Sequence, residues 1–261
     1  MVSQCFYTNE RLSYAFQAMY FGLAIGMILL NLLIFISIKD SSYLLYAGLA
    51  ISFVFSITAL NGLQKEFLPF ESELYFRIAS PSGFAIAQVF ALYFLRNMLK
   101  TRTNIPKFDP LLKGMALCHL CLPFAYYFSE HLFVIPGQAL NFVTMSTIFV
   151  VASQAALRKQ RKAYFFFVAF FIIILAGAVT AAVPLFLFPV SIFSLNALQL
   201  GSAIEMVLMS FAIADRFHVL RAEMLNAQSK ALNIQEKLVE NLKKSEKLLE
   251  EKVAQRTSEL Q

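Results

Sequence analysis

Seven apolar stretches, each long enough to cross a lipid bilayer as a helix, follow one another along the first 214 residues. The hydrocarbon core of a bilayer is roughly 30 Å thick, and an α-helix crosses it in about 20 residues. The hydrophobic fraction is 59% and the charged fraction only 15%, which excludes an ordinary soluble domain. We predict an all-α polytopic membrane protein, a seven-transmembrane helix bundle with spans at residues 15–38, 43–63, 78–99, 111–129, 136–157, 164–188 and 195–214.

The charges in the loops predict the orientation of these spans. With the N-terminus outside, ten Lys and Arg residues lie on the cytoplasmic side, against Arg11, Lys65 and Arg77 outside. Cytoplasmic loops carry an excess of Lys and Arg, so we expect the N-terminus outside and the C-terminus in the cytoplasm. The basic residues behind the net charge of +6 are therefore concentrated on the predicted cytoplasmic side of the membrane. We expect these residues to contact lipid rather than nucleic acid.

The N-terminus has no pattern of a cleavable signal peptide. The first apolar stretch exceeds the 7–15 residues of a signal h-region and lacks a basic segment before it. We therefore predict a short extracytoplasmic N-terminus at residues 1–14, too short for a separate ligand-binding domain, followed by the helix bundle at 15–214.

Residues 215–261 have a different composition, with nine Lys and Arg, eight Asp and Glu, and no Gly or Pro. This mixture predicts a solvated cytoplasmic helix that is continuous with the seventh span. A heptad of apolar residues indicates a parallel coiled coil between two copies, and the alternative is a charged helix on the membrane surface. The predicted seam consists of Leu225, Leu232, Val239, Leu242, Leu249, Val253 and Leu260.

Glu205 is the one carboxylate that we place inside a predicted span, near the middle of the membrane. Ionisable groups at this depth are costly and usually mark a site, a relay or a bond between helices. We expect it to hold helices together or to act in a conformational switch, with proton transport as a further alternative. The other candidate polar residues within the spans are Asn31, Asn61, Gln199 and Ser202.

The sequence lacks the motifs of several kinds of metal, cofactor and catalytic sites. The segment Cys118-His119-Leu120-Cys121 has no second cluster to complete a zinc site, so we expect its cysteines to pack as small apolar side chains. The seventh span contains no Lys for a retinal Schiff base, and no phosphate loop, metalloprotease, nucleophile-elbow or kinase motif occurs. We expect no cofactor, no metal and no enzymatic activity in this chain.

Three blocks of residues carry a resemblance to a known family. The first is the opening hairpin, with residues 20–23, 31–35 and 39–46, and the second is residues 61–63 with 67–69. The third is residues 199–205 with 210–216, which include Asp215 and Arg216 at the junction with the tail. These blocks resemble the bacterial seven-transmembrane receptors with diverse intracellular signalling modules, and the resemblance covers about residues 15–217.

The resemblance implies a sensory receptor in the bacterial inner membrane whose output is a histidine kinase, a diguanylate cyclase or a nucleotide cyclase. The extracytoplasmic domain usual in that family does not precede the spans, and residues 249–260 resemble the linker before an output domain. Two interpretations follow: a piece of a longer receptor, or a short member that acts through a partner protein.

We therefore predict a receptor core that senses an unknown small-molecule or lipid ligand and signals through Asp215 and Arg216 to the coiled coil. A transporter or channel with Glu205 on its pathway is the alternative, and a scaffold that recruits a soluble partner through the tail is a third. Transport folds often contain paired broken helices in inverted repeats, and the sequence has no such pair.

Overall fold

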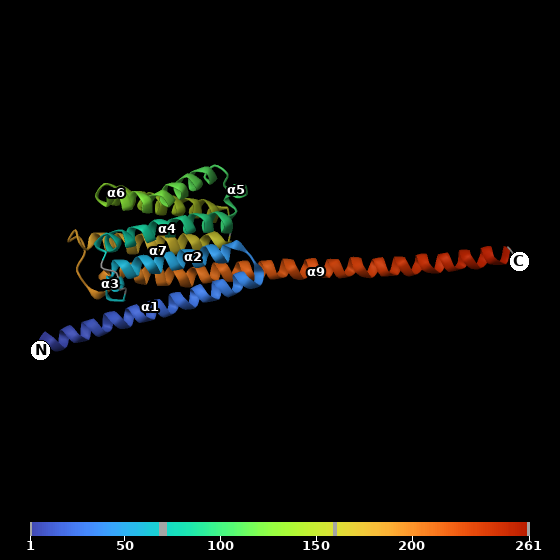
Figure 1. Ribbon diagram of the computed structural model, residues 1–261, viewed down its shortest axis with the longest axis horizontal. Helices are drawn as coiled ribbons and strands as arrows, with labels where there is room; N and C mark the ends of the chain where they lie inside the picture. Colours follow the sequence, from blue (N-terminus) through green and yellow to red (C-terminus); the bar gives the residue numbers. More distant parts are fainter. Residues whose placement is uncertain (1, 68–71, 159–160, 260–261) are drawn as a thin grey trace. The chain divides into compact units, whose positions relative to one another are not determined.

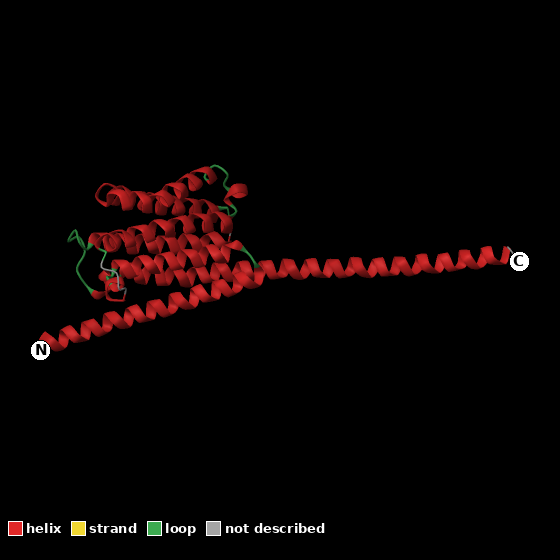
Figure 2. Ribbon diagram, viewed as in Figure 1, coloured by secondary structure: helices red, strands yellow, loops and turns green. Residues whose placement is uncertain are grey.

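The computed structural model describes residues 2–67, 72–158 and 161–259, and all regular elements in these ranges are helices (Figures 1 and 2). The chain divides into two compact units, Met1–Ile213 and Ala214–Gln261. An all-α polytopic membrane protein is thus confirmed for the described residues, six of whose helices are long and apolar enough to cross a membrane.

The first unit is a bundle of long helices in which α1 packs on α2, α2 on α4, α4 on α6 and α6 on α7 (Figure 1). The long helices are α1 (Val2–Ile38), α2 (Ser41–Leu60), α4 (Glu73–Leu99), α6 (Asp109–Leu157), α7 (Arg161–Ala182) and the first part of α9 (Ala197–Glu259). The short helices α3 (Leu63–Phe67), α5 (Thr101–Asn104) and α8 (Ile192–Leu195) lie in the connections.

Helix α6 contains two of the seven predicted spans. Its backbone leaves helical geometry at Ser129, with φ −158° and ψ 82°. His119 Nε2 lies 2.8 Å from Thr144 Oγ1, although 25 residues of straight helix would separate these side chains by roughly 37 Å. The helix therefore folds back at Ser129, and its two halves contact each other as antiparallel segments.

The connection between α1 and α2 is as tight as the sequence predicts. Lys39 adopts a left-handed conformation, with φ 57°, which ends α1. The Asp40 carboxylate then accepts a hydrogen bond of 2.9 Å from the backbone N–H of Ser42 and caps α2. Two residues are thus enough to reverse the chain, because a left-handed residue and an N-cap satisfy the helix ends.

The predicted ends of two spans are wrong by several residues. Helix α7 ends at Ala182 rather than at residue 188, because Pro184 has no N–H for the helix and Phe186 takes a φ of 57°. Helix α4 begins at Glu73, five residues before the predicted start, where a serine hydroxyl caps it. The last long helix, α9, begins at Ala197, within two residues of the predicted start.

A buried ion pair closes the connection between α4 and α6. The Arg96 guanidinium donates to both oxygens of Asp109, at 2.8 and 3.2 Å, and the Thr101 hydroxyl donates to the same carboxylate at 3.0 Å. Asp109 is the first residue of α6, so its negative charge also faces the positive end of that helix dipole.

The second unit is helical through Glu259. Between residues 221 and 253, every side chain whose burial the structure describes is exposed. An isolated helix of this composition is marginally stable in water, and the described apolar side chains of its heptad are exposed.

Candidate functional site

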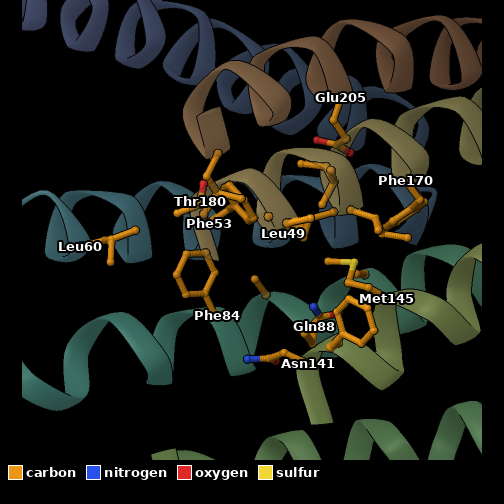
Figure 3. A pocket seen from close by; sticks show the side chains of 18 of the residues that line it. Leu49, Phe53, Leu60, Phe84, Gln88, Asn141, Met145, Phe170, Thr180 and Glu205 are labelled. Atoms are coloured by element: carbon orange, nitrogen blue, oxygen red, sulfur yellow. The ribbon is translucent and has the colours of Figure 1, made fainter. Parts of the chain in front are cut away.

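A cavity of about 510 Å³ lies inside the first unit, between α2, α4, the second half of α6, α7 and the first part of α9 (Figure 3). We call it the bundle pocket. Its walls are mainly apolar and carry aromatic rings such as Phe53, Phe84, Phe142 and Phe170. Its volume falls within the range of small-molecule sites, about 300–1,000 Å³.

Three side-chain oxygens in the wall of the bundle pocket have no hydrogen-bond partner among the described residues. They are Glu205 Oε1, Gln88 Oε1 and Asn141 Oδ1. Glu205 is only 9% exposed and Gln88 only 5%. Glu205 extends from α9 on one side of the pocket, and Gln88 and Asn141 come from the opposite side (Figure 3). Buried polar atoms are normally paired, so these three oxygens point to a ligand or water.

The residues of α9 just before Glu205 connect it to α1. Ser202 Oγ lies 3.2 Å from the Tyr20 hydroxyl and 3.0 Å from the carbonyl oxygen of Gln199. A hydroxyl group donates one hydrogen bond and accepts others, so Ser202 can serve both neighbours at once. Gln199, Ser202 and Glu205 are all buried, and the structure brings these three predicted residues together on one helix.

Tyr46 connects α2 to the same part of α9. Its hydroxyl donates a hydrogen bond of 3.5 Å to the backbone carbonyl of Met206, and both residues line the bundle pocket. This distance is at the long end for an O–H donor, so the bond is weak. A molecule in the pocket would therefore touch both partners of a contact that holds α9.

Gly201 allows α9 to approach α7 closely. A Cβ atom added at Gly201 would lie 2.5 Å from the Cβ of Ala176, closer than two such atoms come. Small residues at helix contacts permit this approach in membranes. Farther along, the rings of Phe165 and Phe211 stack with centroids 6.3 Å apart, so α7 supports α9 at two levels.

The other two predicted polar residues lie elsewhere. Asn31 is buried in α1, where its amide donates to the carbonyl of Met27 on the same helix at 2.7 Å. Asn61 is exposed at the end of α2, where its backbone N–H bonds the carbonyl of Ile57. Neither lines the bundle pocket.

Sequence reasoning missed Tyr20 and Tyr46 as partners of α9. Both are fully or almost fully buried, at 5% and 1% exposure. A tyrosine deep within an apolar stretch must find a hydrogen-bond partner for its hydroxyl, and that signal was present at both positions.

The predicted junction and seam residues lie in the second unit. Asp215 and Arg216 are half-buried. The seam side chains are between 46% and 65% exposed, namely Leu225, Leu232, Val239, Leu242, Leu249 and Val253. The last predicted seam residue, Leu260, lies outside the described residues.

The Cys-His-Leu-Cys segment does not assemble a common site on α6. The side chains of Cys118 and Cys121 are exposed on the apolar helix α6. His119 between them is buried and faces Thr144 in the other half of α6. The described residues contain no group of three His, Cys, Asp or Glu side chains placed to hold a metal ion.

The family model for 7TM diverse intracellular signalling matches residues 13–216, about three quarters of the chain. No curated protein and no solved structure matches the chain. The matched range includes the whole bundle pocket and ends at Arg216, beside the junction between the two units. The chain therefore belongs to the 7TM diverse intracellular signalling family and is a multi-pass membrane receptor with a signalling role.

Proposed function

We propose that this receptor senses a ligand in the bundle pocket and passes the resulting change in packing along α9 to a dimeric, parallel coiled coil. The coiled coil then regulates a cytoplasmic output domain or partner protein, of the histidine kinase, diguanylate cyclase or nucleotide cyclase type. The observation that carries this proposal is that α9 supplies Glu205 and Met206 to the pocket wall and also contains the heptad.

The contacts that hold α9 suit a helix that changes its position. The hydroxyl contacts from Tyr20 and Tyr46 are 3.2 and 3.5 Å long, and each net hydrogen bond stabilises by only about 1 kcal/mol. Where Gly201 of α9 meets Ala176 of α7, both residues are small, so no large side chains interlock at this contact. A ligand shifts such a balance only by its different affinity for the two arrangements.

The apolar heptad supports the proposed dimer. An apolar residue is usually buried at such a seam, and here the residues from Leu225 to Val253 are exposed in the single chain. Two parallel copies would cover both seams at once. Polar residues at Gln228, Gln235 and Glu246 weaken the seam, which suits a linker that changes between registers.

The proposed orientation follows the loop charges, with the N-terminus outside and the C-terminus in the cytoplasm of a bacterium. Arg96 and Lys113, which the charge rule assigns to the cytoplasmic side, both pair with Asp109. The exposed apolar side chains of the first unit, such as Leu33, Phe124 and Phe128, would then contact the lipid of the inner membrane.

The experiment that tests transmission changes the phase of the heptad. An adenylate cyclase domain is fused after Gln261, and one to four residues are inserted between Met224 and Ala231, while a matched control inserts a full heptad. We expect cyclase output to change with the insertion length and to recover with the full heptad, because the seam returns to its original face. Output that is the same at every insertion length would refute transmission through the coiled coil.

A further inference from the structure

We propose that the ligand of the bundle pocket is a lipophilic amine, a compact apolar and aromatic body with a protonated nitrogen that pairs with Glu205. This inference rests on the proposed function for its signalling consequence, whereas the binding itself is measured independently of any output. It follows from three features of the pocket: its only carboxylate, its unpartnered oxygens and its aromatic walls.

The carboxylate of Glu205 lacks a cation. Among the residues that the structure describes, no Lys, Arg or His lines the bundle pocket, and none gives Oε1 of Glu205 a hydrogen-bond partner. A buried carboxylate is costly unless a charge or hydrogen-bond donors compensate it. A ligand ammonium supplies both, since it carries a positive charge and up to three donors.

The wall across the pocket from Glu205 also contains acceptor oxygens that lack a hydrogen-bond donor among the described residues. Gln88 Oε1 and Asn141 Oδ1 are acceptors, and neither has a partner in the described part of the chain. They extend from α4 and α6, across the pocket from Glu205 (Figure 3). A hydroxyl or N–H group at the far end of the ligand would satisfy them.

The pocket lining between Glu205 and the pair Gln88 and Asn141 determines which kind of ligand body fits there. Most of the lining is apolar, with the rings of Phe53, Phe84, Phe142 and Phe170 among its residues. Aromatic faces attract cations as well as apolar groups. An anion such as a fatty acid would meet the Glu205 carboxylate and the acceptor oxygens of Gln88 and Asn141, and no described cation in the lining would pair its charge, so the pocket disfavours it.

The test compares three probes that share one skeleton: naphthylethylamine, naphthylethanol and naphthylacetate. The full chain is placed in nanodiscs of zwitterionic lipid, and saturable changes in naphthalene fluorescence are measured. The chain contains no Trp, so no indole emission interferes. We expect the amine to bind about tenfold more tightly than the alcohol, a difference of about 1.4 kcal/mol, because its ammonium pairs with Glu205 through a charged hydrogen bond. We expect the acid to show no saturable binding.

Two substitutions locate the binding. Glu205→Gln is expected to reduce amine affinity about tenfold and to leave alcohol affinity unchanged. Gly177→Leu is expected to weaken both probes, because a Cβ at Gly177 meets no atom within 4 Å and a larger side chain takes up open pocket volume. Asn31→Leu is the matched control, a buried polar residue outside the pocket, and is expected to change neither affinity.

The proposal is overturned if the amine binds no better than the alcohol, or if Glu205→Gln retains the amine preference. Should Glu205→Gln fail to fold, the three probes on the unaltered chain and the Gly177→Leu variant still decide the question. Phase-dependent cyclase output without amine binding would leave the proposed transmission intact and refute only this ligand. Amine binding without phase-dependent output would support this ligand and refute only the proposed transmission through the coiled coil.

Discussion

Replacing Asp109 by Ala tests how the α4–α6 connection is held. The carboxylate is only 8% exposed and Arg96 only 16%, so the substitution leaves a largely buried guanidinium without a counterion. Breaking a fully buried pair costs about 3–5 kcal/mol. Because Arg96 keeps some contact with solvent, we expect the free energy of unfolding to fall by about 2–4 kcal/mol.

The other partners of this carboxylate contribute less. The Thr101 hydroxyl, at 3.0 Å, adds about 1 kcal/mol as a single hydrogen bond. Lys113 lies 3.3 Å away and its side chain is 55% exposed, so its pair adds less than about 1 kcal/mol. The expected loss therefore comes mainly from Arg96, and a Lys113→Met variant is the matched control.

The assay is equilibrium unfolding of the full chain in mixed micelles, followed by helical circular dichroism, in a double-mutant cycle of Asp109→Ala with Arg96→Met. Arg96 also lies over the ring of Tyr93, with its guanidinium carbon 5.3 Å from the centroid. The cycle cancels this separate contact and isolates the pair. A coupling energy of about 1.5–3 kcal/mol is expected, and a coupling near zero would refute the reasoning.

Three further outcomes are expected. Gly83→Val should lower the free energy of unfolding by about 1–3 kcal/mol in the same micelle assay, because its Cβ would overlap a serine hydroxyl of α2, whereas Gly114→Ala meets no atom and should be close to neutral. His119→Leu should cost about 1–3 kcal/mol by leaving a buried threonine hydroxyl without its partner, and no change in unfolding would contradict the contact within α6. Leu242→Asp with Leu249→Asp should abolish crosslinking between two copies of the chain, and unchanged crosslinking would contradict the dimer.

The spans were predictable because the thickness of a bilayer fixes the length of an apolar helix, whatever its partners. The ends were less predictable where apolar residues continue beyond the helix. Residues 183–188 are almost entirely apolar, so hydropathy carries the sixth span through Pro184, where the helix has already ended. In α6 the helix continues where the sequence predicts a connection between two spans. The backbone leaves helical geometry there only at Ser129.

Part of the candidate site was also predictable. Glu205 stands out because a carboxylate is rare within a span, and Gln199 and Ser202 follow from their spacing on the same helix. The pocket itself was not predictable, because it depends on how α4 and α6 are rotated to turn Gln88 and Asn141 inward. Tyr46 was overlooked for a different reason: its hydroxyl within an apolar stretch calls for a partner, but the chain has 10 Tyr residues, and the sequence does not show which of them contacts the last helix.

The free energies of the contacts around Glu205 explain why a ligand bound there would change the position of α9. Two hydroxyl contacts, from Tyr20 and Tyr46, join α9 to α1 and α2, and together they stabilise by less than about 2 kcal/mol, because the Tyr46 bond is weak. A charged pair formed at Glu205 is of the same size, about 1.5–3 kcal/mol. A ligand that makes this pair in one arrangement of α9 and not in the other can therefore outweigh both contacts and shift a balance of a few kcal/mol.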